Sequence, residues 1–158
     1  MTTLHHMGIT VSNIDVAMEF YRHIIGGTID GPYEKSGPAV DAATGCKGVT
    51  VFLAFIVLDG ESVIELAEYR NGSGERAPTD TNRPGVGHPA FVVDDIEDAI
   101  LRAEQMGYPA LSEPKTATAG PMEGYRYVYL LGPDQLRVEL LETPHLPSAV
   151  HPPSTATH

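Results

Sequence analysis

The sequence predicts an α+β fold built from two copies of a βαβββ module, and an internal repeat carries this prediction. When His6 is aligned with His88, residues 8–17 match residues 90–99 without a gap. Both segments alternate apolar and polar residues and then change to helical spacing, as expected for a strand that leads into a helix. Each module therefore begins with a histidine in its first strand.

The end of each module carries a glutamate in a second pair of matching segments. When Glu65 is aligned with Glu139, Val-Ile-Glu-Leu (63–66) matches Arg-Val-Glu-Leu (137–140). The apolar neighbours of each glutamate suit the face of a sheet that packs under helices, since strand side chains alternate between faces. We therefore expect both carboxylates on the opposite, concave face of a sheet.

The first module spans residues 3–69 and its elements follow from local signals. Ser12-Asn13 is a helix N-cap signal, Gly26-Gly27 is a helix stop, and Asp59-Gly60 is a hairpin turn. The predicted elements are a strand at 3–11, a helix between those two signals, a strand at 28–34, a Gly/Pro-rich loop at 35–48, and strands at 49–58 and 62–69.

The second module spans residues 86–143 and repeats this order after a polar linker at 70–85. Asp94 or Asp95 is predicted to cap its helix and Gly107 to end it. Its strands are predicted at 86–93, near 109–113, at 125–131 and, after a turn at 132–135, at 136–142. The Thr- and Pro-rich residues 144–158 are predicted to form a flexible tail, so that 3–143 is a single domain.

Composition excludes several classes of function. The chain has 158 residues, 42% hydrophobic residues and a formal charge of −11, and it contains no run of basic residues. Binding to nucleic acid or to an anionic membrane surface needs clustered cations, so neither is expected. The single cysteine excludes an intramolecular disulfide, and no apolar stretch approaches the length of a membrane span. We expect a cytoplasmic protein with a small-molecule substrate.

The repeated histidines and glutamates predict a metal site formed by His6, Glu65, His88 and Glu139. A single strand histidine or glutamate is more often structural, but here the same chemistry fills the same position twice. An unpaired carboxylate in the middle of a strand is costly, and a divalent cation would compensate both. Nitrogen and oxygen ligands without sulfur suit one Zn, Ni, Co, Mn or Fe(II) ion. His5 is a rival ligand, but it aligns with Gly87.

These motifs resemble the vicinal oxygen chelate superfamily, which includes glyoxalase I, methylmalonyl-CoA epimerase, extradiol dioxygenases and drug-resistance proteins. The resemblance implies a glyoxalase-like fold of paired modules, with mixed sheets curled around a metal-containing cleft, and it favours a homodimer. It rests on residues 4–15, 20–27, 63–66, 85–97 and 132–142. Pro89 departs from the family pattern and must lie at a bulge or an unpaired edge, because proline cannot donate to a β-ladder.

The resemblance implies a metal-dependent isomerase or lyase of glyoxalase or epimerase type. The metal would stabilise an enolate of a substrate with neighbouring oxygens, and Glu65 or Glu139 would move the proton. Residues 43–48 lack the additional carboxylate of the epimerase branch, which weighs against that branch. Arg137, two residues before Glu139, could bind a substrate carboxylate or form an ordinary ion pair.

Two alternatives stay open. An Fe(II) or Mn(II) extradiol dioxygenase would use a triad of two histidines and one glutamate, and Glu65 as a fourth ligand argues against it. A drug-binding resistance protein typically lacks the metal ligands, so the intact set argues against that function. The tyrosines at 125, 127 and 129 could stack on a planar ligand, although such spacing is more often sheet packing.

Overall fold

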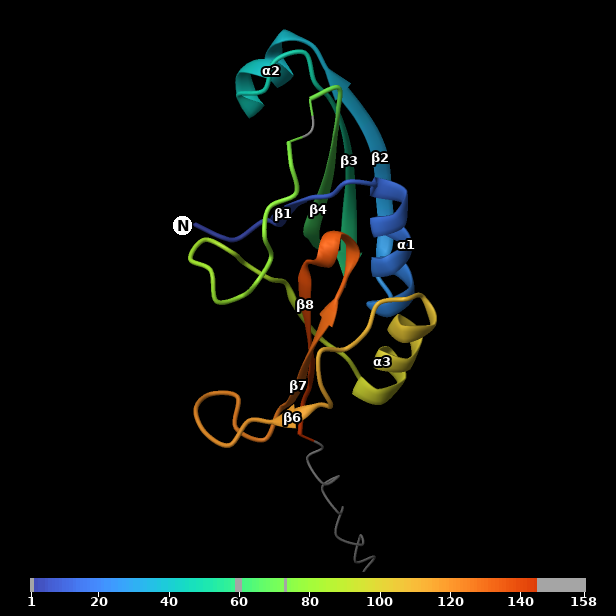
Figure 1. Cartoon of the computed structure of the whole chain (residues 1–158), viewed down its shortest axis with the longest axis vertical. Helices are drawn as coiled ribbons and strands as arrows, with labels where there is room; N and C mark the ends of the chain where they lie inside the picture. Colours follow the sequence, from blue (N-terminus) through green and yellow to red (C-terminus); the bar gives the residue numbers. More distant parts are fainter. Residues whose placement is uncertain (1, 59–60, 73, 145–158) are drawn as a thin grey trace, which may run out of the picture.

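The protein consists of two four-stranded sheets with the two longer helices on one side, which confirms the predicted α+β fold (Figure 1). The computed structural model describes residues 2–58, 61–72 and 74–144. The predicted turn at Asp59-Gly60 and the predicted tail, apart from Pro144, lie outside these residues. Within the described residues, none of the helices has the length and apolar character needed to cross a membrane.

The first sheet has the strand order β1-β4-β3-β2, with β1 parallel to β4. The predicted βαβββ order is confirmed, with one additional helix. The elements are β1 (Met7–Thr10), α1 (Ile14–Ile24), β2 (Thr28–Ser36), α2 (Pro38–Thr44), β3 (Thr50–Leu58) and β4 (Glu61–Arg70).

The second sheet repeats this arrangement with the order β5-β8-β7-β6, and β5 is parallel to β8. Its elements are β5 (Ala90–Val92), α3 (Ile96–Gln105), β6 (Lys115–Thr116), β7 (Arg126–Leu131), a 3-10 turn at Pro133–Gln135 and β8 (Arg137–Glu142). In both sheets the first strand of the module is therefore an edge strand.

The helix caps confirm the local sequence signals. The side chain of Asn13 accepts a hydrogen bond from the backbone N–H of Val16, and that of Asp95 accepts one from Asp98. Gly107 follows α3 with φ +85°, a left-handed conformation that favours glycine and ends the helix. The two modules therefore begin and end their long helices in the same way.

Two predicted elements are wrong. Residues 35–48 are not a loop, because Pro38 opens α2 at its first turn and Gly45 ends it in the left-handed conformation. The strand predicted near 109–113 is reduced to a bridge between Ala110 and Leu130, and the edge strand is β6 instead. The alternation of apolar and polar residues in so short an edge segment did not show whether residues near 109–113 or those of β6 would form the edge strand.

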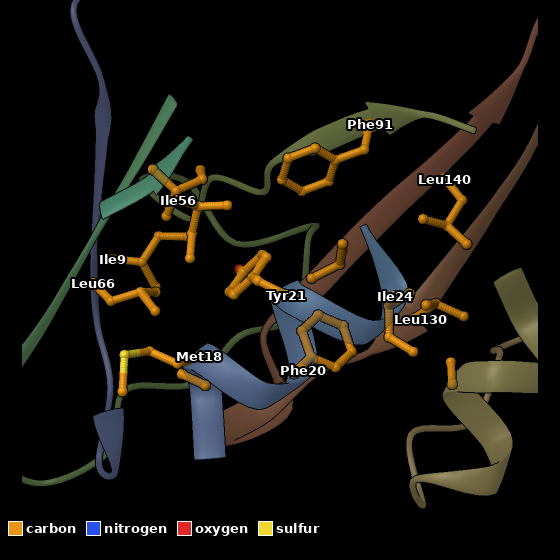
Figure 2. Packing of buried hydrophobic residues seen from close by; sticks show 14 of the residues in the cluster. Ile9, Met18, Phe20, Tyr21, Ile24, Ile56, Leu66, Phe91, Leu130 and Leu140 are labelled. Carbon is orange, nitrogen blue, oxygen red and sulfur yellow. The ribbon is translucent and has the colours of Figure 1, made fainter. Parts of the chain in front are cut away.

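The larger of two hydrophobic clusters joins the modules through α1, whereas a smaller one includes Val51 and Ala67 of the first sheet. Phe20, Tyr21 and Ile24 lie between residues of the first sheet, such as Leu66, and residues of the second, such as Leu140 (Figure 2). The ring of Phe20 meets that of Tyr108 at 4.8 Å, and Tyr21 meets Phe91 at 6.0 Å. Because α1 and α3 cover one side of the sheets, the opposite faces are left for the site.

Candidate metal centre

The two faces of each sheet are distinguished by burial. On β8, Val138, Leu140 and Glu142 are buried, whereas Arg137, Glu139 and Leu141 are half-buried. On β4, Ile64, Leu66 and Glu68 are buried and Glu65 is half-buried. Glu65 and Glu139 therefore point away from the helices, as expected from the alternation of strand side chains. We call these opposite sides the site faces of the two sheets.

The first half-site consists of His6 and Glu65. The Nε2 atom of His6, just before β1, lies 3.8 Å from Oε1 of Glu65 on β4. Glu65 stands opposite Gly8 on β1 and Phe55 on β3, and the ring of His6 lies edge-on to that of Phe55 at 6.0 Å. The Nδ1 atom of His6 lies 2.7 Å from that of His5, and the other ring nitrogen of His6, Nε2, faces the carboxylate.

The second half-site repeats this geometry with His88 and Glu139. The Nε2 atom of His88 lies 3.1 Å from Oε2 of Glu139. Glu139 stands opposite Ala90 on β5 and Tyr129 on β7. His88 precedes β5, and Pro89 accepts a hydrogen bond from Glu139 N–H through its carbonyl instead of donating to the ladder. Each histidine is thus paired with the glutamate that the repeat predicted.

Tyr129 is a site residue that sequence reasoning assigned only to possible stacking. Its hydroxyl lies 3.3 Å from Nε2 of His88, and the two rings meet edge-on at 5.1 Å. Burial raises the pKa of Tyr129, and the nearby Glu139 carboxylate raises it further. Phe55 and Tyr129 each lie ten residues before the glutamate of their module, and this matching hairpin spacing could have identified Tyr129.

Two further glutamates, which the sequence did not single out, face the helices. Glu68 accepts a hydrogen bond from Ile14 N–H at the start of α1 and pairs with Arg70. Glu142 accepts one from Ile96 N–H at the start of α3 and pairs with Arg126. Both therefore have a positive partner as well as a helix N-terminus, which favours an anion.

By contrast, the site-face glutamates lack such compensation. Among the described residues, no lysine or arginine forms an ion pair with Glu65 or Glu139; each is paired only with its histidine. The exposed fractions of these two side chains are 25% and 14%. Half-buried carboxylates with imidazole nitrogens beside them suit a divalent cation, which accepts oxygen and nitrogen ligands together. The residues therefore fit the metal that their pattern predicts.

The structure does not bring the two half-sites together within one chain. All four residues are among those described, yet no three of them offer ligand atoms within 4.8 Å of one another. The predicted cleft with four ligands around one ion therefore stays a prediction for this chain. Each sheet supplies one histidine–glutamate pair of the predicted four-ligand site.

A different acidic cluster brings three carboxylates close together at the start of α3. Asp95, Glu97 and Glu142 offer oxygens within 4.8 Å of one another. Arg126 pairs with both Glu97 and Glu142, Asp95 caps α3, and the hydrogen bond with Arg126 lowers the pKa of Glu97. The cluster is thus satisfied by an arginine and a helix N-terminus, and a metal ion would have to displace that arginine.

Arg137 has the ordinary ion pair that the sequence left open as an alternative. Its guanidinium lies 3.3 Å from a carboxylate oxygen of Asp80 and donates to Thr79 Oγ1 at 3.2 Å. Its side chain is 19% exposed and shares the site face with Glu139. A role for Arg137 in substrate binding stays a prediction.

Comparison with known proteins identifies relatives of the whole domain. The family model described as the Glyoxalase/Bleomycin resistance protein/Dioxygenase superfamily matches residues 3–140. A 2-epi-5-epi-valiolone epimerase from Actinomyces sp is 31% identical over 151 residues, which cover 89% of this chain and 79% of that protein.

Solved structures show the same fold. A glyoxalase family protein from Bacillus cereus superimposes with a TM-score of 0.79 at 22% identity, over 91% of this chain and 95% of that one. The fosfomycin resistance protein FosX from Listeria monocytogenes, complexed with Mn(II) and sulfate, superimposes with a TM-score of 0.55 at 16% identity, over 92% of this chain and 95% of that one.

Proposed function

Because the chain belongs to the glyoxalase/bleomycin resistance protein/dioxygenase superfamily, we propose that it is a metal-dependent isomerase of epimerase type. It would act on a small carbonyl compound with two neighbouring oxygens. The observation that carries this proposal is the repeated pairing of His6 with Glu65 and of His88 with Glu139, at equivalent positions of the two sheets and without another cation. A named relative that is an epimerase supports it.

The proposed roles divide between binding and proton transfer. The divalent ion, when bound by the four side chains, would supply Lewis-acid polarisation of the substrate oxygens. Epimerisation removes a proton from one face of a carbon and returns it to the other, which two carboxylates from facing walls can do. Glu65, farther from its histidine and more exposed than Glu139, is the better placed to leave its imidazole and take the proton.

The segment that weighed against the epimerase branch does not prevent this chemistry. Residues 43–48 contain the end of α2 and the turn after it, and they carry no carboxylate. Asp41, earlier in α2, accepts a hydrogen bond from Gly48 N–H. With Glu65 and Glu139 as the acid and base, no further carboxylate is needed. The dioxygenase alternative has less support, since Glu65 lies beside His6 as a fourth donor.

We also propose that two copies of the chain complete the site. The strands next to the half-sites, β1 and β5, are both at the edge of their sheets, with one side unpaired among the described strands. Within one chain, α1 and α3 share a core and hold the two sheets beside each other. Pairing β1 of one copy with β5 of another would place the first half-site against the second, which makes a homodimer with two complete sites.

Metal analysis tests the ligand set. We expect about one divalent ion for each set of four ligands, and its loss in His88→Ala. The exposed His23 on α1, whose Nδ1 lies beside the carbonyl and carboxylate of Glu19 on the same helix, gives the control variant His23→Ala. Full metal content in His88→Ala would contradict the proposed site.

Proton exchange tests the reaction. The metal-loaded protein is incubated in D2O with 2-epi-5-epi-valiolone, the compound in the relative's name, and proton NMR follows exchange and inversion at carbons next to the carbonyl. EDTA should abolish exchange, and Ni, Co or Mn should restore it. Exchange that persists after verified metal removal would contradict the mechanism, and oxygen consumption coupled to catechol loss would favour the dioxygenase.

A further inference from the structure

The geometry points to an anion-binding subsite beside the second half-site, formed by Arg76 and Arg137. Its ligand would be a carboxylate or phosphate group of the substrate. The subsite is a hollow of about 280 Å³ between the linker and the end of the second sheet. Its lining includes Arg76, Thr79, Asp80, Leu131, Gln135 and Arg137. The link to a substrate rests on the proposed function, whereas the binding of an anion does not.

The hollow adjoins the half-site through the register of β7 and β8. Leu131 pairs with Arg137, and Tyr129 pairs with Glu139 in the next row on the same face. Rows two residues apart along a strand are separated by about 7 Å. A ligand at Glu139 can therefore reach Arg137 with a group only a few bonds away.

The arginines around this hollow are notable because the chain as a whole is acidic. It has ten lysines and arginines against 21 acidic residues. Arg76 is exposed and, among the described residues, forms no ion pair; it lines this hollow and a neighbouring one of about 360 Å³. Arg137 and Arg83 share one carboxylate, that of Asp80. Two guanidinium groups thus share the Asp80 carboxylate, while Arg76 adds a third that has no ion pair among the described residues.

The acidic residue that lines the neighbouring hollow, Asp134, has its own hydrogen-bond partners. Its carboxylate accepts hydrogen bonds from the backbone N–H and the hydroxyl of Ser12. Thr79 donates to the carbonyl of Gln135 and receives a hydrogen bond from Arg137, which holds the linker against the sheet. Arg137 is therefore positioned, and Arg76 is available to an incoming anion as its second partner.

This arrangement narrows the substrate class. A substrate that places its two neighbouring oxygens at the proposed metal site would carry an anionic group about 7 Å away, at Arg137 and Arg76. Planar guanidinium groups bind both carboxylates and phosphates in a bidentate way, so the geometry serves either group.

Titration with simple anions tests the subsite. The metal-loaded protein is titrated with inorganic phosphate and, separately, with acetate, and binding is followed by NMR of the arginine side chains. Arg76→Gln and Arg137→Gln should each weaken binding about tenfold. The control is Arg22→Gln, an exposed arginine of α1 that pairs with Glu19 and should leave binding unchanged. Tighter binding of phosphate indicates a phosphorylated substrate, and equal or tighter binding of acetate indicates a carboxylate.

The proposal is contradicted if neither anion binds, or if Arg76→Gln binds both as tightly as the unaltered protein. Arg76 is exposed, so this variant tests the subsite even if Arg137→Gln disturbs the linker. Titration of His88→Ala separates the two proposals. Anion binding that survives loss of the metal supports the subsite whatever the reaction, whereas binding that disappears with the metal places the anion on the ion and contradicts the subsite.

Discussion

At the scale of single residues, four glutamates at matching positions of β4 and β8 show how the same side chain takes different roles on opposite faces of a sheet. Glu68 and Glu142 face the helices, where an arginine and a helix N-terminus stabilise their charge. Glu65 and Glu139 face the other way, and among the described residues each forms an ion pair only with its histidine. The repeat identified the second pair because each glutamate has a matching histidine. The repeat did not identify Glu68 and Glu142, because their partner arginines do not occupy matching positions: Arg70 lies on β4 and Arg126 on β7.

The Glu68 carboxylate makes stability depend on pH. Its hydrogen bond with Arg70 lowers its pKa below the ordinary 4.5, against the opposing effect of burial. A lowered pKa in the folded state contributes stability above the unfolded value, and this stability is lost as the pH falls through the folded one. Glu68→Gln should therefore reduce the free energy of unfolding by about 1–2 kcal/mol at pH 7.

The difference between Glu68→Gln and the unaltered protein should shrink below about pH 4.5, as measured by urea unfolding across the pH range. Glu104→Gln, at an exposed position of α3, is the control and should change little. A difference that stays constant from pH 7 to pH 3 would refute the assigned role of the charge.

Tyr129 makes the two half-sites chemically unequal. Tyr129→Phe converts the second half-site to the composition of the first, which has Phe55 at that position. The variant should keep its metal content and lower the rate of proton exchange about ten- to hundredfold, through loss of a hydrogen-bond donor beside the reacting oxygens. Tyr127→Phe, at the next position on the same face, serves as the control. An unchanged rate in Tyr129→Phe would exclude the hydroxyl from the reaction.

At the scale of elements, the ends of the long helices were predicted best, because their signals are local in the sequence. The caps at Asn13 and Asp95 and the stop at Gly107 fix the long helices, because they satisfy backbone groups without help from distant residues. The loop predicted at 35–48 is wrong because proline and glycine can also mark the ends of a helix, and Pro38 and Gly45 stand at the two ends of α2. The strand predicted near 109–113 is only a bridge at Ala110, because two short edge segments compete to pair with β7 and the local pattern does not favour either.

A substitution on the edge strand β5 tests the proposed homodimer. Val92 lies on the site face of this strand and is 62% exposed, which a partner chain would cover. Val92→Asp should weaken dimerisation about tenfold or more, because association would bury a charge, and it should weaken metal binding in parallel. Sedimentation velocity and metal titration measure the two effects.

Leu101→Asp is the matched control for this edge, since Leu101 is 53% exposed on α3, on the helical side of the molecule. It should leave both dimerisation and metal binding unchanged. Equal dimerisation of Val92→Asp and Leu101→Asp would show that β5 is not part of an interface.

At the scale of the whole molecule, we expect the two modules to unfold as one unit, because the larger hydrophobic cluster includes residues of both. Phe20 is fully buried, contacts the ring of Tyr108, and approaches Gly132 so closely that a Cβ there would lie 3.3 Å from its ring. Phe20→Ala should lower the free energy of unfolding by about 3–5 kcal/mol. Tyrosine fluorescence and backbone circular dichroism should report a single urea transition. Two separate transitions would mean that the modules unfold independently.

The repeat predicted the composition of the candidate site but not its assembly. Equivalent positions in two modules follow from aligned sequences, so the pairs of His6 with Glu65 and of His88 with Glu139 could be predicted. Whether these pairs meet depends on how the modules dock, and docking is decided by α1 packing against both sheets. That packing rests on residues such as Phe20 and Tyr21, whose contacts with the second module no local pattern encodes.

Mixing of two inactive variants tests most directly whether two copies share the four ligands. His6→Ala chains alone and His88→Ala chains alone should bind no metal, whereas a mixed dimer keeps one complete set, with His6 from one chain and His88 from the other. We expect elemental analysis of the unfolded-and-refolded mixture to show restored metal binding. A mixture that binds no metal, although mixed dimers are shown to form, would contradict a site built between two chains.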